Sequence, residues 1–334
     1  MIPLVSVGMP VYNGARFLRE ALDSLLSQDY PRFEIVICDN ASDDGTEAIC
    51  REYQAREPRI RYSRNPENLG AVYNFNLVFE RSNGEFFMWA ACDDVWAPTF
   101  ISKCTELLLA HPEASLCHVE SRQMTTEGRP FGEPYRGFVN ADPNPRVRWR
   151  RVLSNLGWHM AIYGMMRASC LRRSGLIRKG WGSDQLLIAE MALYGTIVQV
   201  PEQLWWHRRP ETLSAGDAYR LVMQKMQPPG RTAAPRRWTQ WGIHREYVRI
   251  ALDTQLTSGV RRQLALDAVR NYASSAAWAN DLEEIGVPLH PLRRLKRVLR
   301  GGARLPVPSG TGRQAGPAGK EWVPSAESHA GAES

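Results

Sequence analysis

The sequence lacks the features that mark zinc-binding, secreted and membrane-spanning proteins. Its 334 residues include six cysteines with no Cys-x-x-Cys pair and seven dispersed histidines, so no structural zinc site is indicated. It contains no uninterrupted apolar run of about twenty residues, the length that a helix needs to cross a bilayer. The N-terminal MIPLVSVGMPVY lacks the basic start of a signal peptide. We therefore expect reduced, mostly buried thiols in a cytoplasmic protein.

Two common phosphate-binding signatures are also missing. No Gly-x-Gly-x-x-Gly follows the first apolar run and no Walker A lysine loop is present, so dinucleotide and P-loop proteins lose their main sequence support. What the chain has in excess is positive charge, with 42 Lys and Arg against 35 Asp and Glu and a net charge of +7. This excess favours an anionic partner such as a phosphate-bearing substrate or a lipid surface. No nucleic-acid motif accompanies it, so no specific nucleic-acid partner is expected.

Strand and helix patterns alternate through the first third of the chain. The predicted strands cover residues 4–9, 33–38, 59–64 and 85–91, and a helical pattern follows each of them. The first strand is expected to stop at Pro10, and the later helices to cover 46–56, 71–80 and 99–111. Such alternation predicts an α/β fold with a Rossmann-like, mostly parallel, doubly wound central sheet and flanking helices on both faces.

Beyond residue 113 the pattern is mixed. SLCHV, MAIYGMM and TIVQVP are predicted strands, and SDQLLIAEMALYG (183–195) is a predicted helix capped by Ser183. From about residue 216 the chain is mostly helical, and its last 34 residues carry Gly, Pro, Ser and Ala without periodicity. The sequence therefore predicts a domain of residues 1–214, a helical C-terminal extension of residues 215–300 and a disordered tail of residues 301–334.

Unusual polar clusters follow three of the predicted strands: PVYN (10–13), DNASDD (39–44) and Asp93-Asp94. Open parallel sheets bind ligands at the carboxyl ends of their strands, so the clusters are expected to converge on one edge. Asp93-Asp94 is either a pair of oxygen ligands for a hard divalent cation or a solvated turn that caps the helix near Thr99. The presence of the other two clusters favours the cation site.

These segments, together with GSDQLLIAEMALYG, resemble the family 2 glycosyltransferases over roughly residues 4 to 214. The resemblance implies a GT-A fold and an inverting hexosyl- or deoxyhexosyltransferase. Such an enzyme moves a sugar from a nucleotide-diphosphate sugar to an acceptor hydroxyl with the help of Mg²⁺ or Mn²⁺. The expected acceptor is a glycan or a lipid-linked molecule in surface polysaccharide or glycoconjugate synthesis.

Two rival hypotheses stay open. One is a nucleotidyltransferase that forms NDP-sugars, which would need a Gly- and Lys/Arg-rich phosphate loop that PVYNGARF does not offer. The other is a non-catalytic module that binds a nucleotide sugar or nucleic acid.

The resemblance also assigns roles to individual residues. Asp94 binds the metal, and Asp93 reaches toward the ribose or a metal-bound water. Asp39 accepts a hydrogen bond from the nucleobase, and Tyr12 packs against its ring. The remaining candidates for donor binding are Pro10, Asn13, Ser42, Asn68, Arg208 and Arg209. Alternatively, Asp39 and Ser42 belong to an Asx- or Ser-type turn that caps the helix at residue 46, with Ser42 or Asp44 favoured as the cap over Asp39, and Asn68 lies in a simple turn.

Two departures from the family pattern affect this assignment. His207, in WWHRRPETLS, is a further candidate for the metal or the phosphates, but it is displaced from the family's usual Arg-Arg-His order. Ala91 stands where family members often have an additional acid.

Inverting transfer needs a base that takes the proton of the acceptor hydroxyl. Asp184, at the start of the 183–195 helix, occupies the position of this base in the family. An aspartate in the first turn of a helix is also favoured by the helix dipole alone. The aromatic-bearing segment Gly180-Trp181-Gly182 favours the catalytic alternative, with Trp158 and His159 as further candidates to line the acceptor side.

A basic segment, LHPLRRLKRVLRGGAR (289–304), contains six Arg and Lys and no acid. Its leucines and valine form one helical stripe, a pattern typical of a helix on an anionic membrane surface. A solvated basic helix and nonspecific attraction to nucleic acid are the alternatives. We expect peripheral association with the inner face of the cell membrane.

Overall fold

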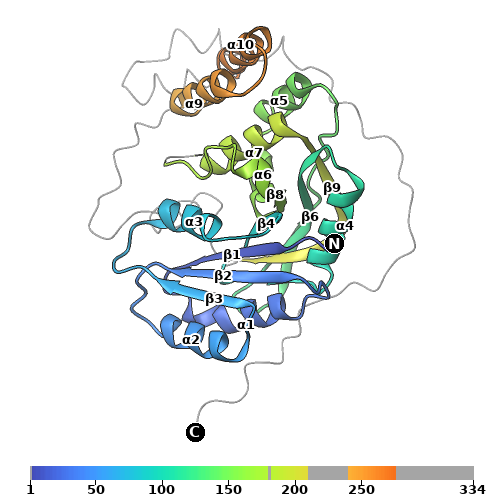
Figure 1. The fold of residues 1–334 in the computed structure, drawn as a ribbon. Helices are drawn as coiled ribbons and strands as arrows, with labels where there is room; N and C mark the ends of the chain where they lie inside the picture. Colours follow the sequence, from blue (N-terminus) through green and yellow to red (C-terminus); the bar gives the residue numbers. More distant parts are fainter. Residues whose placement is uncertain (1, 180–181, 210–239, 276–334) are drawn as a thin grey trace.

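The structure, a computed structural model, describes residues 2–179, 182–209 and 240–275 (Figure 1). Nine strands form one sheet in the order β3-β2-β1-β4-β8-β6-β9-β5, with β7 paired to β6. The strands are β1 (Val5–Val11), β2 (Phe33–Asp39), β3 (Ile60–Arg64), β4 (Phe86–Trp89), β5 (Val95–Trp96), β6 (Ala114–Met124), β7 (Pro130–Tyr135), β8 (Met165–Arg167) and β9 (Thr196–Arg208).

The helices lie on both faces of this sheet. They are α1 (Ala15–Leu26), α2 (Thr46–Arg56), α3 (Ala71–Glu80), α4 (Phe100–Ala110), α5 (Pro145–Leu153), α6 (Ala168–Leu171), α7 (Ser183–Tyr194), α9 (Gln240–Asp253), α10 (Ser258–Ser274) and a 3₁₀ helix η1 (Leu156–Tyr163). This arrangement confirms the predicted α/β class.

The sheet is parallel where it carries the predicted polar clusters. β1 pairs in parallel with β2 and β4, and β2 pairs in parallel with β3. β8 joins β4 and β6 in antiparallel direction, whereas β9 runs parallel to β6. The sheet is therefore mostly parallel through β3, β2, β1 and β4 and mixed beyond β4, where the sequence pattern was mixed as well.

Alternating side chains explain why both faces are covered. Ile35 and Ile37 of β2 belong to a core with α1, α2 and α4, whereas Val36 and Cys38 belong to a second core with α3, α5, α7, α9 and α10. Gly8 of β1 faces this second core, where an added Cβ would lie 2.5 Å from the ring of Phe87. Both faces of the strands are apolar because both are buried.

Several predicted element boundaries are wrong. β1 continues through Pro10, which pairs with Cys38. The Gly8 carbonyl accepts a hydrogen bond from the Ala90 amide, on the β4 side of β1. Two residues later, the backbone of Pro10 faces the same side, but β4 has already ended there. The N–H that proline lacks would therefore have no partner in β4, and the sheet loses no hydrogen bond. MAIYGMM is mostly the 3₁₀ helix rather than a strand. Ser183 does not cap α7, because Gly182, at φ 76°, holds the cap position and Ser183 is already helical.

The helices α9 and α10 pack against the rest of the fold through α5 and α7. The Trp149 ring of α5 meets Tyr247 of α9 edge to face at 5.6 Å, and its indole donates to the Leu264 carbonyl of α10 at 3.1 Å. The helical character predicted after residue 216 thus holds for residues 240–275. The basic segment 289–304 and the tail 301–334 lie outside the described residues, and the predicted domain boundaries remain predictions. No helix in the described ranges is long and apolar enough to cross a membrane.

Candidate active site at the carboxyl ends of the parallel strands

The loops after β1 and β2 are bound to each other. The Asn13 amide donates to Ser42 Oγ at 2.9 Å, and the Asp43 amide donates to Asn13 Oδ1 at 3.0 Å. Asp44 accepts from the first amides of both α1 and α2, Ala15 N at 3.1 Å and Thr46 N at 2.9 Å. Asp44 therefore binds the first amide of each helix, although Gly14 and Gly45 hold the N-cap positions and neither Ser42 nor Asp44 is the cap residue predicted for the helix at residue 46. Tyr12, 38% exposed, stands on this paired platform.

Asp39 is fully buried at the end of β2 and uses both carboxylate oxygens. Oδ1 accepts from the Ser42 amide at 2.8 Å and from its hydroxyl at 2.6 Å. Oδ2 accepts from the Tyr62 hydroxyl at 2.8 Å and from Arg64 Nη1 at 2.7 Å. Burial, and then the bond to Asp39, raise the pKa of Tyr62, so this hydroxyl keeps its proton. Asp39 thus holds the side chains of Ser42, Tyr62 and Arg64 in place.

Asn68 is held by a group of amide side chains. Its Oδ1 accepts from Asn40 Nδ2 at 2.7 Å and from the Gly70 amide at 2.9 Å. Asn40 and Asn74 are in turn joined by Asn65, and Asn74 donates to the Cys38 carbonyl at 2.7 Å. The loop before α3 is therefore pinned to the end of β2, beside Asp39.

The acidic pair occupies the turn between β4 and β5. Asp93 is half-buried, and Asp94 is 4% exposed. Asp94 accepts from the Trp205 indole at 3.0 Å and from the Arg208 backbone amide at 2.9 Å. Burial, and then the charge of Asp93, raise the pKa of Asp94 well above its ordinary value. Neither acid caps α4, since Thr99 holds that position.

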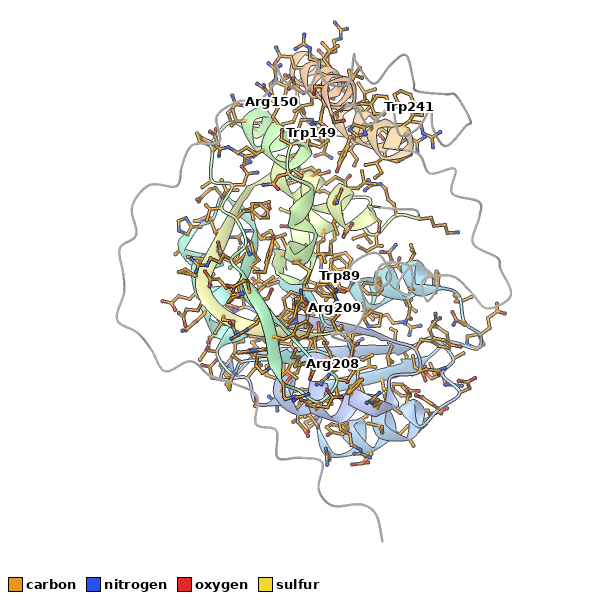
Figure 2. The ribbon with its side chains drawn as sticks, turned by 180° about the vertical axis from the view of Figure 1, so that it is seen from behind. Trp89, Trp149, Arg150, Arg208, Arg209 and Trp241 are labelled. Carbon is orange, nitrogen blue, oxygen red and sulfur yellow. The ribbon has the colours of Figure 1, made fainter. Side chains whose placement is uncertain are left out.

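Arg208 binds this turn from β9. Its Nε donates to the Asp93 carbonyl at 2.9 Å, and Nη1 donates to the carbonyls of Thr125 and Thr126 at 3.1 and 3.0 Å. Nη2 pairs with Glu20 at 2.6 Å, and the side chain is 3% exposed. In Figure 2 Arg208 lies beside α1, which carries Glu20. The guanidinium is committed to the protein, so contact between Arg208 and a phosphate stays a prediction.

An aromatic wall runs from the acidic turn toward α7. The Trp205 ring lies 5.0 Å from Tyr163 and 5.3 Å from His207, centroid to centroid. Burial raises the pKa of Tyr163, and the negative charges of Asp94, Asp93 and Asp184 raise it further. The Tyr163 phenol therefore keeps its proton.

Asp184 lies in the first turn of α7. The residue is half-buried, and its Oδ1 accepts from the Gln185 amide at 2.8 Å. The segment that leads to it is anchored twice. Asn76 of α3 exchanges two hydrogen bonds of 3.0 Å with the backbone of Ile177, and Arg178 pairs with Glu190, which is buried, at 2.7 Å. These contacts fix the entry to α7 relative to α3.

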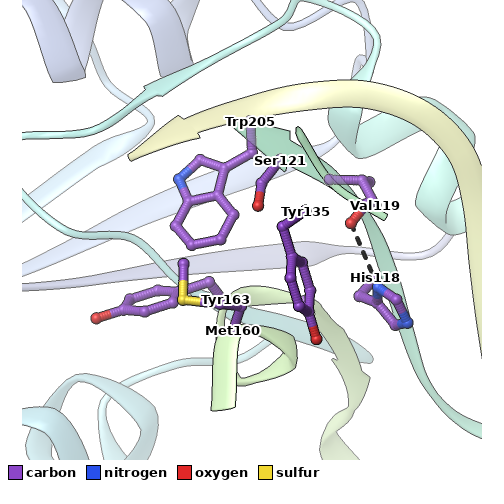
Figure 3. Close-up of a pocket in the computed structure, with 8 residues that line it drawn as sticks. His118, Val119, Ser121, Tyr135, Met160, Tyr163 and Trp205 are labelled. Atoms are coloured by element: carbon purple, nitrogen blue, oxygen red, sulfur yellow. Dashed lines mark hydrogen bonds between the residues drawn. The ribbon is translucent and has the colours of Figure 1, made fainter. Parts of the chain in front are cut away.

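A small pocket lies behind the aromatic wall (Figure 3). Trp205, Tyr163 and Tyr135 form its sides, and the Ser121 hydroxyl points into it from β6. His118, whose two ring nitrogens lie near the backbone oxygens of Val119 and Phe138, closes one end. Its volume of about 10 Å³ has room for no more than about one water molecule, so the pocket as it stands is too small for a sugar ring.

The predicted cation site at this edge of the sheet has two carboxylates, those of Asp93 and Asp94. In the described ranges no three His, Cys, Asp or Glu side chains are grouped closely enough to hold a metal ion. Mg²⁺ is commonly bound by one or two carboxylates together with substrate phosphates and water. Asp94 keeps lone pairs besides those used by its two hydrogen bonds, so the turn fits such a cation when further oxygens arrive with a ligand.

The structure places most predicted site residues at one edge of the sheet. Pro10, Tyr12, Asn13, Asp39, Ser42 and Asn68 form the part over β1 and β2, whereas Asp93, Asp94, His207 and Arg208 form the part at β5 and β9. Arg209, half-buried, donates its backbone amide to the Met124 carbonyl. The side chains of Trp158 and His159, and residues 180–181 and 210–214, lie outside the described residues.

Sequence reasoning missed Tyr163, Trp205 and Glu20. Tyr163 stands in an apolar run that predicts a strand, and Trp205 stands in the segment WWHRRPETLS, whose predicted role is to bind metal or phosphate. Glu20 lies 188 residues before its partner Arg208, and neither spacing nor pattern connects the two. The one sequence feature that could have drawn attention to Tyr163 is its place beside a glycine, as the single tyrosine of the apolar run MAIYGMM.

Comparisons with known proteins agree on one family. The model described as Glycosyl transferase family 2 matches residues 6–173. An uncharacterized glycosyltransferase of Rickettsia typhi is 39% identical over 106 residues, 32% of each chain. The putative teichuronic acid biosynthesis glycosyltransferase TuaG of Bacillus subtilis is 34% identical over 107 residues, 32% of this chain and 42% of TuaG. An uncharacterized protein of Mycobacterium tuberculosis is 34% identical over 213 residues, 59% of this chain and 56% of the relative.

Solved structures share the fold. The crystal structure of residues 1–349 of S. aureus TarS superposes with a TM-score of 0.58 at 16% identity, covering 89% of this chain and 87% of that one. The same TarS segment in complex with UDP-GlcNAc gives a TM-score of 0.57. The matches to the curated relatives named above span between about a third and just over half of the length of those relatives.

Proposed function

The chain belongs to glycosyl transferase family 2, and on that premise we propose that it transfers a sugar from a nucleoside diphosphate to an acceptor hydroxyl. The observation that carries the proposal is the acidic turn of Asp93 and Asp94, which Trp205 and Arg208 of β9 hold at the carboxyl ends of the strands. Family membership favours transfer over the rival hypotheses of a nucleotidyltransferase and a binding module.

The nucleotide is proposed to lie over the ends of β1 and β2. Tyr12 offers an exposed ring for stacking with the base. Asp39 already accepts four hydrogen bonds, so a base N–H must replace one of them. Arg64 is the partner to be replaced, because its side chain is 32% exposed whereas Ser42 is buried. Since TarS was crystallised with UDP and UDP-GlcNAc, uridine diphosphate sugars are the first donors to test.

The diphosphate is proposed to lie at the acidic turn. Asp93 and Asp94 are the residues that would hold Mg²⁺ or Mn²⁺, with His207 as a further candidate. When bound, the cation would neutralise the charge that develops on the leaving diphosphate. Of the two predicted phosphate-binding arginines, Arg209 is preferred, because the guanidinium of Arg208 is buried in contacts with the protein.

Asp184 is proposed to be the general base. We propose that the acceptor binds on the α7 side, so that its hydroxyl would approach the sugar from the face opposite the diphosphate. Attack from that face inverts the anomeric centre. The relative TuaG is named for teichuronic acid biosynthesis. For this chain we propose a surface-glycan or lipid-linked acceptor at the cytoplasmic face of the membrane.

Donor binding and transfer are tested separately. UDP, UDP-GlcNAc and UDP-glucose are added to the full chain with and without Mn²⁺, and the melting temperature is followed, because ligands of the folded state raise it. Asp184→Asn should retain the donor-induced shift and lose transfer, while Asp253→Asn on the distant surface of α9 should retain both. Normal transfer by Asp184→Asn would refute the assignment of the base. A donor response that does not depend on metal would refute the cation site.

A further inference from the structure

The outer side of the α9–α10 hairpin carries exposed apolar side chains. Trp241 and Leu252 of α9 are 48% and 45% exposed, and Leu266 and Val269 of α10 are 53% and 45% exposed. The exposed positions are 241, 245, 249, 252 and 253 in α9, and 258, 259, 262, 263, 266, 269, 270, 273 and 274 in α10. The opposite sides of both helices are buried against α5 and α7. We call these two exposed stripes together the outer hairpin face.

The charged side chains on this face are almost all basic. Residues 240–275 contain five arginines and three acids. Two of the acids are buried and paired: Glu246 with both Arg245 and Arg249, and Asp267 with Arg146 of α5 at 2.6 Å. The side chains of Arg245 and Arg249 are 55% and 61% exposed. Asp253 is thus the one exposed acid on the described part of the hairpin.

The basic surface continues onto α5. Arg150 and Arg151 are exposed in its last turn, and Figure 2 shows Arg150 and Trp241 at the same end of the molecule. That end is opposite to α1 and α2 (Figure 1). Apolar and basic side chains therefore share one end of the protein, away from the nucleotide platform.

We propose that the outer hairpin face docks on an anionic lipid bilayer. A tryptophan and aliphatic side chains interleaved with arginines are the composition of helices that lie in the membrane interface. A charged soluble partner would match the arginines but would leave Leu252, Leu266 and Val269 in contact with polar groups. A bilayer with anionic headgroups satisfies both sets at once. This inference goes beyond the proposed sugar transfer and does not depend on it.

Sedimentation with lipid vesicles tests the proposal on the full chain. The protein should pellet with vesicles that contain phosphatidylglycerol, pellet less as salt rises, and stay in solution with phosphatidylcholine alone. Replacing Arg262 and Arg270 by glutamine should lower the partition coefficient roughly fivefold for each arginine removed. Leu266→Ser and Trp241→Ser should each lower it as well, without making binding more sensitive to salt.

Matched variants at other sites control for net charge and hydropathy. Arg51→Gln with Arg56→Gln, on α2, removes the same charge as the α10 pair, and Leu109→Ser removes a leucine that is 54% exposed on α4. These variants should bind vesicles like the wild type, and thermal unfolding should show that every variant is folded. Unchanged vesicle binding by the α9 and α10 variants would overturn the proposal. So would a shift of oligomeric state, seen by light scattering in those variants alone, because it would assign the face to a second copy of the chain.

Discussion

Replacing Arg208 by glutamine should lower the free energy of unfolding, because the side chain binds the protein itself and not a ligand. The guanidinium makes four hydrogen bonds, three to carbonyls and one to Glu20, and is 3% exposed. A hydrogen bond to a charged group contributes about 1.5–3 kcal/mol, but the four share one side chain and do not add. Removing one partner of a buried pair costs about 3–5 kcal/mol. Because Glu20 is itself 23% exposed, we expect a loss near the lower end of that range.

Urea unfolding followed by tryptophan fluorescence measures this loss. Arg51→Gln is the matched control, since Arg51 is 63% exposed and pairs with Glu47 within one helix, and it should cost less than about 0.5 kcal/mol. A double-mutant cycle with Glu20→Gln isolates the ion pair, for which a coupling of about 1 kcal/mol or more is expected.

The opposite result would refute the reasoning. If Arg208→Gln unfolded like the wild type while its affinity for UDP fell, Arg208 would be the phosphate ligand that the sequence predicted and not a clamp on the acidic turn.

Three further perturbations test other parts of the structure. Burial alone would raise the pKa of Glu34, but bonds from Ser6, Arg61 and the Asn83 amide outweigh it and lower that pKa. The stability from Glu34 should therefore be present above the ordinary glutamate pKa and lost as pH falls through the lowered one. Urea titrations should show this acid-side loss in the wild type and not in Glu34→Gln, and equal slopes would contradict it. Trp205→Phe keeps an aromatic ring, though a smaller one, but removes the indole donor to Asp94. It should weaken Mn²⁺ binding about tenfold, and unchanged affinity by calorimetry would argue against a metal at this turn. Asn76→Ala frees the segment before Asp184 and should lower kcat about tenfold with little change in the donor KM, whereas a change in KM alone would place Asn76 in donor binding.

Local pattern predicted the parallel half of the sheet well. α2 and α3 have the predicted bounds, and β1, β2 and β4 each lie within about two residues of theirs. Their signals are local, since each strand is an apolar run closed by turn residues and each helix has an apolar stripe. β7 (PFGEPY) was missed because two prolines and a glycine argue against a strand. As an outer strand paired only to β6 among the described strands, β7 tolerates the hydrogen bonds that proline cannot make.

The contacts around the candidate site could not be predicted in the same way. Asp94 and the Trp205 indole are 111 residues apart, and Asn76 and Ile177 are 101 residues apart. These residues meet because β8, β6 and β9 join the sheet beside β4 in an order that differs from their order in the sequence. The sequence predicted the residue types that the chemistry requires, whereas the residues that hold them in place emerge only from the fold.

The two acids at neighbouring strand ends differ in how their charge is compensated, and this difference separates their roles. Asp39 is paired with Arg64 at 2.7 Å, so its negative charge is already balanced by a positive charge of the protein. Asp94 receives its described hydrogen bonds from the Trp205 indole and the Arg208 backbone amide, and both of these donors are neutral. Burial of a carboxylate beside a second acid is costly unless a positive charge compensates it. The charge of Arg208 favours ionised Asp94, but burial and the charge of Asp93 outweigh it and raise the pKa of Asp94, so we expect the divalent cation at Asp94 and not at Asp39.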